Sequence, residues 1–433
     1  MYSEEIRQEL QEKDIETGDQ IKVNGKEGKL MPKPGTGDKN IINLKLESGY
    51  NIGLEPEDIE LVEKKDSSEQ KDVKIEYDEE KADILVLHTG GTIASRVSYE
   101  TGGVKASFEQ EDMVQMYPNV MEEANIYSEV YVGKIMSEDM EPGHWEGIAE
   151  KIDEVKDDYD GIIVGHGTDT LASTAAALNL MLKGIDTGVL LVGSQRSSDR
   201  PSTDARMNLF CATKFLSETD FTGIGVCMHK NSSDDVCSIL PGAKSRKMHT
   251  SRRDAFKPIN AEELATVNYD TGDIDYEHEQ EDKEYRKRTE LDGNVGYLKT
   301  RPGMDVDKLD FLIEQDYDGV IIEGTGLGHM PISAFDEETE HHTEIQEKLE
   351  ELTEDTVVAM TSNCIHGRVD MDVYDNQVKV KKRGVIEAED MHPELAYVKL
   401  MWSLGQASDM EEAKEIFQKN INGEISERSM ISG

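Results

Sequence analysis

The sequence is poor in cysteine, aromatic residues and long apolar runs. It has 433 residues, of which four are cysteine, 6% are aromatic and 36% are hydrophobic. The cysteines are far apart and form no CxxC pair, so we predict neither a disulfide framework nor a metal site. No window approaches the roughly 20 consecutive apolar residues of a membrane span, and we expect none. The N-terminal stretch MYSEEIRQELQEKD is acidic and lacks the apolar core of a signal peptide, which favours the cytoplasm.

Positive charge is also scarce. Lysine and arginine total 47 against 91 aspartate and glutamate residues, so the formal net charge is −44. Acidic residues occur in every segment, which indicates a uniformly acidic surface. Such a surface suits a salt-rich cytoplasm, since about 1 M salt screens charges beyond about 3 Å, and we take halophily as a hypothesis. The charge disfavours nucleic-acid binding by this chain alone, because nucleic-acid-binding proteins usually present a basic face.

The composition and the hydrophobic pattern of the sequence change along the chain. A short acidic helix is followed by brief apolar runs punctuated by glycine and proline, which is typical of a small β-barrel-like interaction domain. Two highly charged stretches read as linkers, and the segments after them alternate strand and helix patterns, which predicts α/β domains with a largely parallel sheet. The predicted order is β-barrel-like domain 1–65, linker 66–81, α/β domain 82–276, linker 277–292 and α/β domain 293–433.

The first α/β domain contains a regular series of expected elements. The apolar runs predict strands at 84–87, 126–134, 161–164, 189–192 and 223–228. The helical patterns predict helices at 109–117, 144–156, 171–183 and 204–218. Catalytic groups are then expected in the loops that follow the carboxyl ends of the strands.

Two of these strands end in glycine and threonine. The stretch ILVLHTGGTIAS (84–95) stops at Thr89, Gly90, Gly91 and Thr92, where a sharp turn can display a hydroxyl as a candidate nucleophile. Alone, it fits an ordinary strand-to-loop turn equally well. The stretch GIIVGHGTDTLAST (161–174) likewise displays Thr168 beside an aspartate, just before a helix. Two such parallel strands could place both hydroxyls around one crevice.

A basic island lies in the segment SRKMHTSRRDAF (245–256). Lys247 could be a general base if burial or neighbouring charge lowered its pKa, or its ammonium could hold Asp169 and Thr168 in a proton relay. The alternative is that the island only neutralises local acidity.

Together, TGGTI (89–93), HGTDT (166–170) and this lysine resemble the asparaginase/glutaminase family. The resemblance implies an asparaginase-like fold with two α/β domains and amide hydrolysis through an acyl-enzyme, without a metal or cofactor in this chain. It also implies roles for seven residues: Thr92 as nucleophile, Thr168, Asp169 and Lys247 as the second catalytic group, Tyr99 as a mobile-loop tyrosine, and Ser137 and Glu138 as substrate-binding residues. Glu138 stands where many members of the family have glutamine, which departs from the usual pattern.

The N-terminal module and the long loop SQRSSDRPSTDA (194–205) are similar to those of the D subunits of archaeal glutamyl-tRNA(Gln) amidotransferases. That resemblance implies a glutaminase that supplies ammonia to an E-type partner subunit. The partner would use ATP and Mg²⁺, bind most of the Glu-tRNA(Gln), and join a homodimer of this chain in a heterotetramer. Two alternatives stay open: a free-standing cytoplasmic L-asparaginase with an added N-terminal module, and a non-catalytic scaffold.

Overall fold

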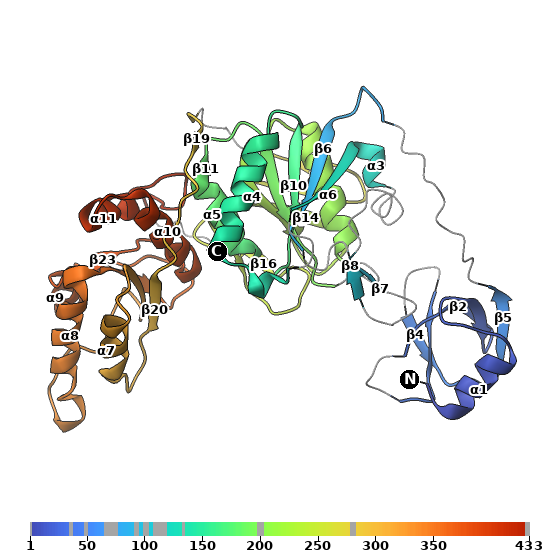
Figure 1. Ribbon diagram of the computed structural model, residues 1–433, viewed down its shortest axis with the longest axis horizontal. Coiled ribbons are helices and arrows are strands. Elements are labelled where there is room, and N and C mark those ends of the chain that lie inside the picture. The colour runs from blue at the N-terminus through green and yellow to red at the C-terminus, as the bar shows by residue number, and fades with distance from the viewer. Residues whose placement is uncertain are drawn as a thin grey trace.

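The chain forms three units that lie in a row, with an α/β unit between a small N-terminal β unit and a second, C-terminal α/β unit (Figure 1). The computed structural model describes residues 2–33, 38–46, 51–64, 77–90, 95–97, 104–106, 119–131, 135–196, 203–277 and 283–428. None of the helices in these ranges has the length and the apolar run that crossing a bilayer requires.

The N-terminal unit is an antiparallel sheet with one helix on its buried face. Helix α1 (Glu4–Glu12) places Ile6 and Leu10 against Ile21, Val23 and Leu44 of the sheet. The sheet order among the described strands is β4-β3-β2-β1-β5. This arrangement confirms the prediction of a small N-terminal β domain. The strands are β1 (Gln20–Val23), β2 (Lys26–Leu30), β3 (Ile42–Lys45), β4 (Asn51–Leu54) and β5 (Ile59–Glu63).

The central unit is built on a mixed sheet with the order β18-β17-β14-β13-β12-β10-β6-β9 among the described strands. The five strands from β13 to β9 are parallel, and the other three extend the sheet antiparallel. Strands β10 and β12 are buried along their whole length, which explains their uninterrupted apolar sequences. The bounds are β6 (Asp83–His88), β9 (Asn125–Val130), β10 (Gly161–Gly165), β12 (Gly188–Val192), β13 (Gly223–His229), β14 (Val236–Pro241), β17 (Ala265–Asn268) and β18 (Ile274–Asp275).

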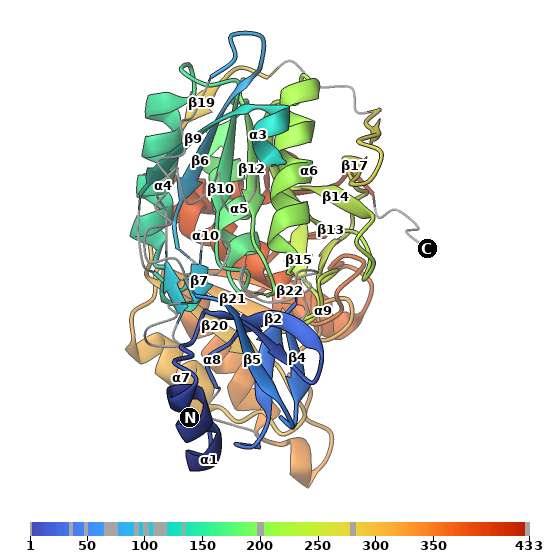
Figure 2. The same ribbon diagram turned by 90° about the vertical axis from the view of Figure 1, so that its right-hand side faces the viewer.

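Helices cover both faces of this sheet (Figure 2). Helices α4 (Pro142–Val155) and α5 (Leu171–Met181) share one hydrophobic core, and α3 (Val120–Glu123) and α6 (Ala205–Glu218) share the core on the opposite face. Layers of this kind confirm the predicted α/β fold. The smaller elements of the unit are β7 (Ser95–Val97) paired with β8 (Val104–Ala106), the 3-10 turn Ser137–Asp139, and β15 (Ser245–Lys247) paired with β16 (Phe256–Pro258).

Two expected elements differ from the structure, and a third lies outside the described residues. The helix expected at 171–183 ends at Met181, because residues 182–183 form strand β11 (Leu182–Lys183), which pairs with β19 (Arg286–Lys287). The positive φ of Gly184 then turns the chain away. The strand expected at 126–134 ends at Val130, and residues 132–134 lie outside the described part of the chain, as does the helix expected at 109–117.

The C-terminal unit has a parallel sheet in the order β20-β21-β22-β23 among the described strands. Helix α10 packs on α5 of the central unit, so one hydrophobic core spans both α/β units. The bounds are β20 (Val295–Lys299), β21 (Gly319–Gly324), β22 (Val357–Ser362), β23 (Ile386–Glu387), α7 (Asp307–Glu314), the 3-10 turn Glu337–Thr339, α8 (His342–Asp355), α9 (Asp375–Lys381), α10 (Pro393–Gln406) and α11 (Met410–Gln418).

The segment after α11 closes the junction between the two α/β units. Glu424 and Lys399 form an ion pair of 2.6 Å whose side chains are both fully buried. Ser426 accepts a hydrogen bond of 2.5 Å from Lys244 of the central unit, whose ammonium also contacts Asp390 at 2.5 Å. Residues from the central unit, the C-terminal unit and the final described segment therefore meet in one buried polar cluster.

Candidate active site

Strands β6 and β10 deliver the two threonine motifs to the same edge of the sheet. They are parallel neighbours, with His88 of β6 opposite Gly165 of β10. Immediately after β6, Thr89 donates to the carbonyl of Gly165 from both its backbone nitrogen (3.0 Å) and its hydroxyl (3.1 Å). The segments that leave these strands therefore start side by side. Thr92 and Tyr99, which follow β6, lie outside the described residues.

The turn after β6 requires glycine at position 90. The φ of Gly90 is +111°, and a Cβ added there would lie 2.1 Å from the carbonyl oxygen of Ile135. No L side chain fits without a backbone shift. The backbone at Gly90 therefore passes unusually close to the loop that carries Ser137.

Thr168, Asp169 and Lys247 form one hydrogen-bonded group. Lys247, the last residue of β15, reaches back to the β10 loop, where its ammonium donates to Thr168 Oγ1 at 2.8 Å and to Asp169 Oδ1 at 2.7 Å. The lysine side chain is 13% exposed, whereas the Asp169 side chain is 65% exposed. The ammonium is thus held on the protein side of the group, and the threonine hydroxyl is fixed by a charged donor.

Ser137 lies beside this group, and Glu138 is exposed to solvent. Ser137 is buried, and its carbonyl accepts a hydrogen bond of 2.6 Å from the hydroxyl of Thr170. A Cβ added at Gly167 would lie 2.7 Å from the Ser137 Cβ, so these two residues touch. Five residues expected in the site therefore lie on neighbouring segments: Ser137, Glu138, Thr168, Asp169 and Lys247.

His166, at the base of the β10 loop, is a structural residue. Its Nδ1 lies 2.7 Å from the Gly167 carbonyl, and its Nε2 lies 2.9 Å from the Thr174 hydroxyl. Burial lowers the pKa of His166 to about 4, although the bond to the Gly167 carbonyl acts in the opposite direction. The ring is therefore neutral near pH 7, with Nδ1–H donating and Nε2 accepting.

The sequence did not reveal two further residues that shape the site. A Cβ added at Gly193 would lie 2.8 Å from Thr168 Cγ2, so this glycine supports the threonine directly. Asp204 is fully buried and accepts hydrogen bonds from the backbone nitrogens of Gln195 (2.8 Å) and Arg196 (3.0 Å). The position of Asp204 at the start of a helix suggests a capping residue, and only the structure shows that it binds the preceding loop instead.

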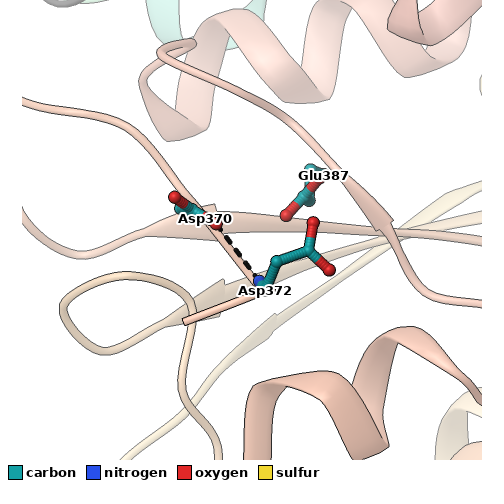
Figure 3. A group of neighbouring side chains, drawn as sticks. All are labelled: Asp370, Asp372 and Glu387. Atoms are coloured by element: carbon teal, nitrogen blue, oxygen red, sulfur yellow. Dashed lines mark hydrogen bonds between the residues drawn. The ribbon is translucent and has the colours of Figure 1, made fainter. Parts of the chain in front are cut away.

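A group of acidic residues in the C-terminal unit has the spacing of cation ligands. Oxygen atoms of Asp370, Asp372 and Glu387 lie within 4.8 Å of one another (Figure 3). The Lys381 ammonium, however, contacts Asp372 at 2.6 Å and Glu387 at 3.2 Å. Two of the three carboxylates already share a positive partner, and we assign no cation to the group.

Family models match three parts of the chain. Residues 83–282 match the N-terminal asparaginase model, and residues 294–417 match the glutaminase/asparaginase C-terminal domain. Residues 15–64 match the GatD N-terminal domain. The matched ranges contain the central, C-terminal and N-terminal sheets, respectively.

Similar proteins extend along the whole chain. The D subunit of the glutamyl-tRNA(Gln) amidotransferase from Pyrococcus furiosus is 41% identical, with 97% of each chain covered. Its counterpart from Methanopyrus kandleri is 39% identical, with 98% of this chain and 94% of the relative covered. Among solved structures, the thermostable L-asparaginase from Thermococcus kodakarensis is 32% identical with a TM-score of 0.70, and the match covers 79% of this chain and 99% of that one.

Proposed function

The chain belongs to the family of glutamyl-tRNA(Gln) amidotransferase D subunits, and from this we propose that it is the glutaminase of such an amidotransferase. Its reaction releases ammonia from the side-chain amide of glutamine. The ammonia then converts Glu-tRNA(Gln) to Gln-tRNA(Gln) on a partner subunit, so the complete assembly is a carbon–nitrogen ligase. We also propose that the chain is divided as its sequence predicts. The N-terminal domain ends at residue 65, the first α/β domain begins at residue 82, the second linker begins at residue 277, and the second α/β domain begins at residue 293.

The observation that carries this proposal is the contact of Lys247 with both Thr168 and Asp169 at the sheet edge to which β6 delivers the TGGTI motif. Hydrolysis of an amide needs a nucleophile, a group that moves protons, and donors for the oxyanion. We assign the nucleophile to Thr92, with Tyr99 assisting it. The Lys247 ammonium orients the Thr168 hydroxyl, and Asp169 balances the charge of the ammonium.

The reaction proceeds in two steps. The hydroxyl oxygen of Thr92 attacks the amide carbon of glutamine, its proton passes to the leaving nitrogen, and ammonia departs. Water then attacks the acyl-enzyme ester, a proton returns to the threonine oxygen, and glutamate is released. The Thr168–Asp169–Lys247 group positions the protons and the water in these steps, while Ser137 and Glu138 hold the amino-acid end of the substrate.

The charge of the chain fits a division of labour with a partner. A chain with a net charge of −44 repels the phosphates of tRNA, so an E-type subunit would hold Glu-tRNA(Gln) and use ATP and Mg²⁺ to activate it. The chain itself needs no cofactor for amide hydrolysis. We further propose that two copies of this chain join two E-type subunits, and that the assembly works in a salt-rich archaeal cytoplasm.

The test is ammonia release from glutamine by the full chain, alone and with its partner. We expect Thr92→Val to abolish release, and Lys247→Met to lower kcat by about 10³-fold, because residues that act as one catalytic unit each carry most of its effect. Lys257→Met is the matched control, because Lys257 lies on the paired strand and contacts the Lys230 carbonyl. Unchanged ammonia release by Thr92→Val in the complex would instead identify a non-catalytic scaffold.

A free-standing L-asparaginase is the second candidate, and the similarity to the Thermococcus kodakarensis structure favours it. That match covers 79% of this chain, whereas the match to the Pyrococcus furiosus relative covers 97%. Amidotransferase D subunits therefore account for more of the sequence. Rapid hydrolysis of asparagine by the chain alone, with no response to an E-type subunit, would decide for the asparaginase.

A further inference from the structure

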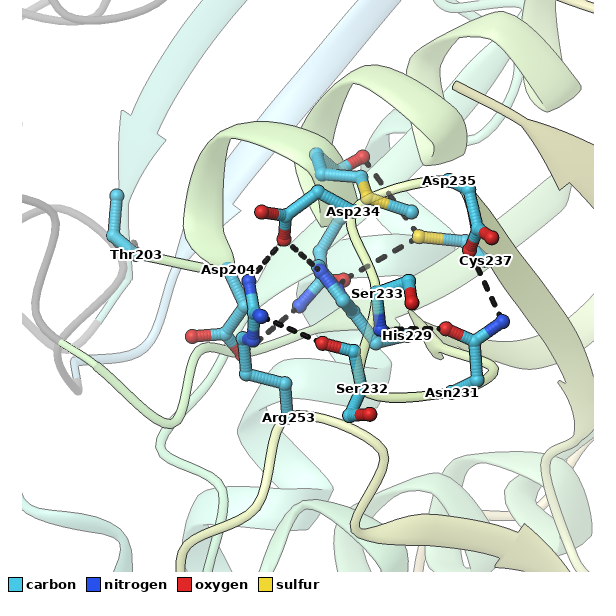
Figure 4. Close-up of polar contacts among 12 residues, drawn as sticks. Thr203, Asp204, His229, Asn231, Ser232, Ser233, Asp234, Asp235, Cys237 and Arg253 are labelled. Atoms are coloured by element: carbon cyan, nitrogen blue, oxygen red, sulfur yellow. Dashed lines mark hydrogen bonds and ion pairs between the residues drawn. The ribbon is translucent and has the colours of Figure 1, made fainter. Parts of the chain in front are cut away.

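A buried polar cluster lies behind the Thr168–Asp169–Lys247 group, at the ends of β12 and β13. Figure 4 shows Asp204, His229, Asp234 and Arg253 gathered there from separate segments of the chain. His229, the last residue of β13, is 1% exposed and lies at the centre of the contacts. None of the catalytic roles assigned above uses it.

One side of the His229 ring connects to Thr168. Its Nδ1 lies 2.6 Å from Asn208 Oδ1. The Asn208 amide nitrogen donates to the Gly193 carbonyl at 3.0 Å, so Oδ1 is the acceptor and Nδ1 of the histidine carries a hydrogen. Gly193 in turn touches Thr168, since an added Cβ would lie 2.8 Å from Thr168 Cγ2. We call this series of contacts, from His229 through Asn208 to Gly193, the first arm. It holds the end of β12, against which Thr168 packs.

On its other side, the His229 ring faces Asp234. Its Nε2 lies 3.3 Å from Asp234 Oδ1, and Asp234 also pairs with the Arg253 guanidinium. Arg253 donates to the Ser232 carbonyl at 2.6 Å as well. Arg253 belongs to the turn between β15 and β16, and Lys247 is the residue at which β15 enters this turn. The second arm therefore anchors the hairpin that carries the lysine.

The two arms differ in how they use the His229 ring. Burial, together with the nearby Arg253 guanidinium, holds the pKa of His229 below its usual value, although the carboxylates of Asp204 and Asp234 act in the opposite direction. A neutral ring with its hydrogen on Nδ1 donates a hydrogen bond to Asn208, whereas its bare Nε2 and the Asp234 carboxylate are both acceptors and form no hydrogen bond. Only the arm toward Thr168 passes through the ring, whereas Asp234 holds the hairpin of Lys247 through Arg253.

Building on the function proposed above, we propose that His229 is a positioning residue that keeps the Lys247 ammonium within hydrogen-bonding distance of Thr168. These two partners are 79 residues apart in sequence and meet through one contact of 2.8 Å. A displacement of about 1 Å would break that contact and misplace the catalytic group. The His229 ring holds the support of Thr168, and the loop that follows His229 in the chain holds the hairpin of Lys247 through the pairing of Asp234 with Arg253.

Two conservative variants separate the arms. His229→Asn keeps an amide nitrogen near the position of Nδ1 and loses the contact with Asp234, whereas His229→Gln places its amide near Nε2 and loses the bond to Asn208. We expect His229→Gln to lower kcat for ammonia release from glutamine at least tenfold and His229→Asn to lower it less, with KM changed by less than about twofold. His341→Asn, which removes a histidine contact with the Met304 carbonyl in the C-terminal unit, should leave kcat unchanged.

The decisive measurement is a double-mutant cycle in the full chain. If His229 acts through Lys247, adding His229→Gln to Lys247→Met causes no further loss of kcat. If the two losses multiply, His229 has no positioning role, although the catalytic assignment of Lys247 stands. If Lys247→Met alone retains normal kcat, the catalytic assignment fails and the positioning role fails with it. Should His229→Gln not fold, Asn208→Ser removes the acceptor of the His229 Nδ1–H and takes its place in the cycle.

Discussion

Acidification should destabilise the central unit through His166. The ring is buried and neutral, and its pKa falls from 6.5 in the unfolded chain to about 4 in the folded one. Between these values the unfolded state binds more protons than the folded state, so the free energy of unfolding decreases as the pH falls. The full effect of the shift is about 3 kcal/mol, and about 2 kcal/mol of it is lost between pH 7.5 and pH 5.

The assay is urea unfolding at pH 7.5, 6 and 5 in constant molar KCl. The chain has two tryptophans, and Trp145 in α4 lies in the core that also contains α5. A Trp402→Phe background therefore leaves a fluorescence signal from the unit that contains His166. Each variant is made in this background, so the titration of the many carboxylates is common to all curves.

We expect His166→Gln to show a pH dependence that is about 2 kcal/mol shallower than that of the parent between pH 7.5 and 5. His366→Gln is the control, because His366 is exposed and its curve should follow the parent. The variant also loses hydrogen bonds to Gly167 and Thr174, so its stability at pH 7.5 should already be lower by about 1–3 kcal/mol. Parallel curves for His166→Gln and the parent would refute the assignment of a buried, neutral ring.

Three further predictions concern packing, the buried ion pair and salt. Gly193→Ala should lower kcat for ammonia release from glutamine at least tenfold, because the added Cβ would collide with Thr168. Gly293→Ala is the control and should leave kcat unchanged, because its Cβ has ample space. Lys399→Met should lower the free energy of unfolding by about 3–5 kcal/mol, since it leaves the Glu424 carboxylate buried without its partner, and Lys399→Met combined with Glu424→Gln should recover part of that loss in urea titrations. Transfer from about 1 M to about 0.1 M KCl should lower the thermal midpoint, because the Debye length grows from about 3 Å to about 10 Å; an unchanged midpoint would argue against halophily.

The sequence predicts the core strands well because their chemistry is local. Strands β10 and β12 are buried on both faces, so they appear as continuous apolar runs that stop at glycine. The short strands β11 and β19 could not be predicted in this way. Each has two residues, three of the four residues are lysine or arginine, and their pairing joins segments about a hundred positions apart.

The candidate site was predictable from motifs, but its support was not. The spacing of TGGTI and HGTDT, together with the family resemblance, indicated Thr168, Asp169 and Lys247 as a group, and the structure places their polar atoms within 2.8 Å of the ammonium. Thr92 and Tyr99 stay predictions, since they lie outside the described residues. The role of His229 behind the Thr168–Asp169–Lys247 group could not be predicted, because it depends on contacts among four separate segments that no local pattern encodes.

Charged residues in the C-terminal unit were the hardest to interpret. The segment 409–420 looks like a peripheral acidic helix, yet α11 buries Ala413 and Phe417 in the shared core. Lys399 likewise appears in sequence as a surface residue of a helix, and its burial depends on a glutamate that follows α11. Long-range pairing of this kind overrides the usual preference of lysine for solvent.

The buried contact between Lys399 and Glu424 also determines which polypeptides can complete the fold. A chain that stops before residue 424 leaves Lys399 with no carboxylate to accompany it into the interior. The attachment of the C-terminal unit to the central unit through Ser426 likewise requires the segment that follows α11. Prematurely terminated chains should remain recognisable to cellular proteases, so that only polypeptides translated through this region persist as ammonia-producing subunits.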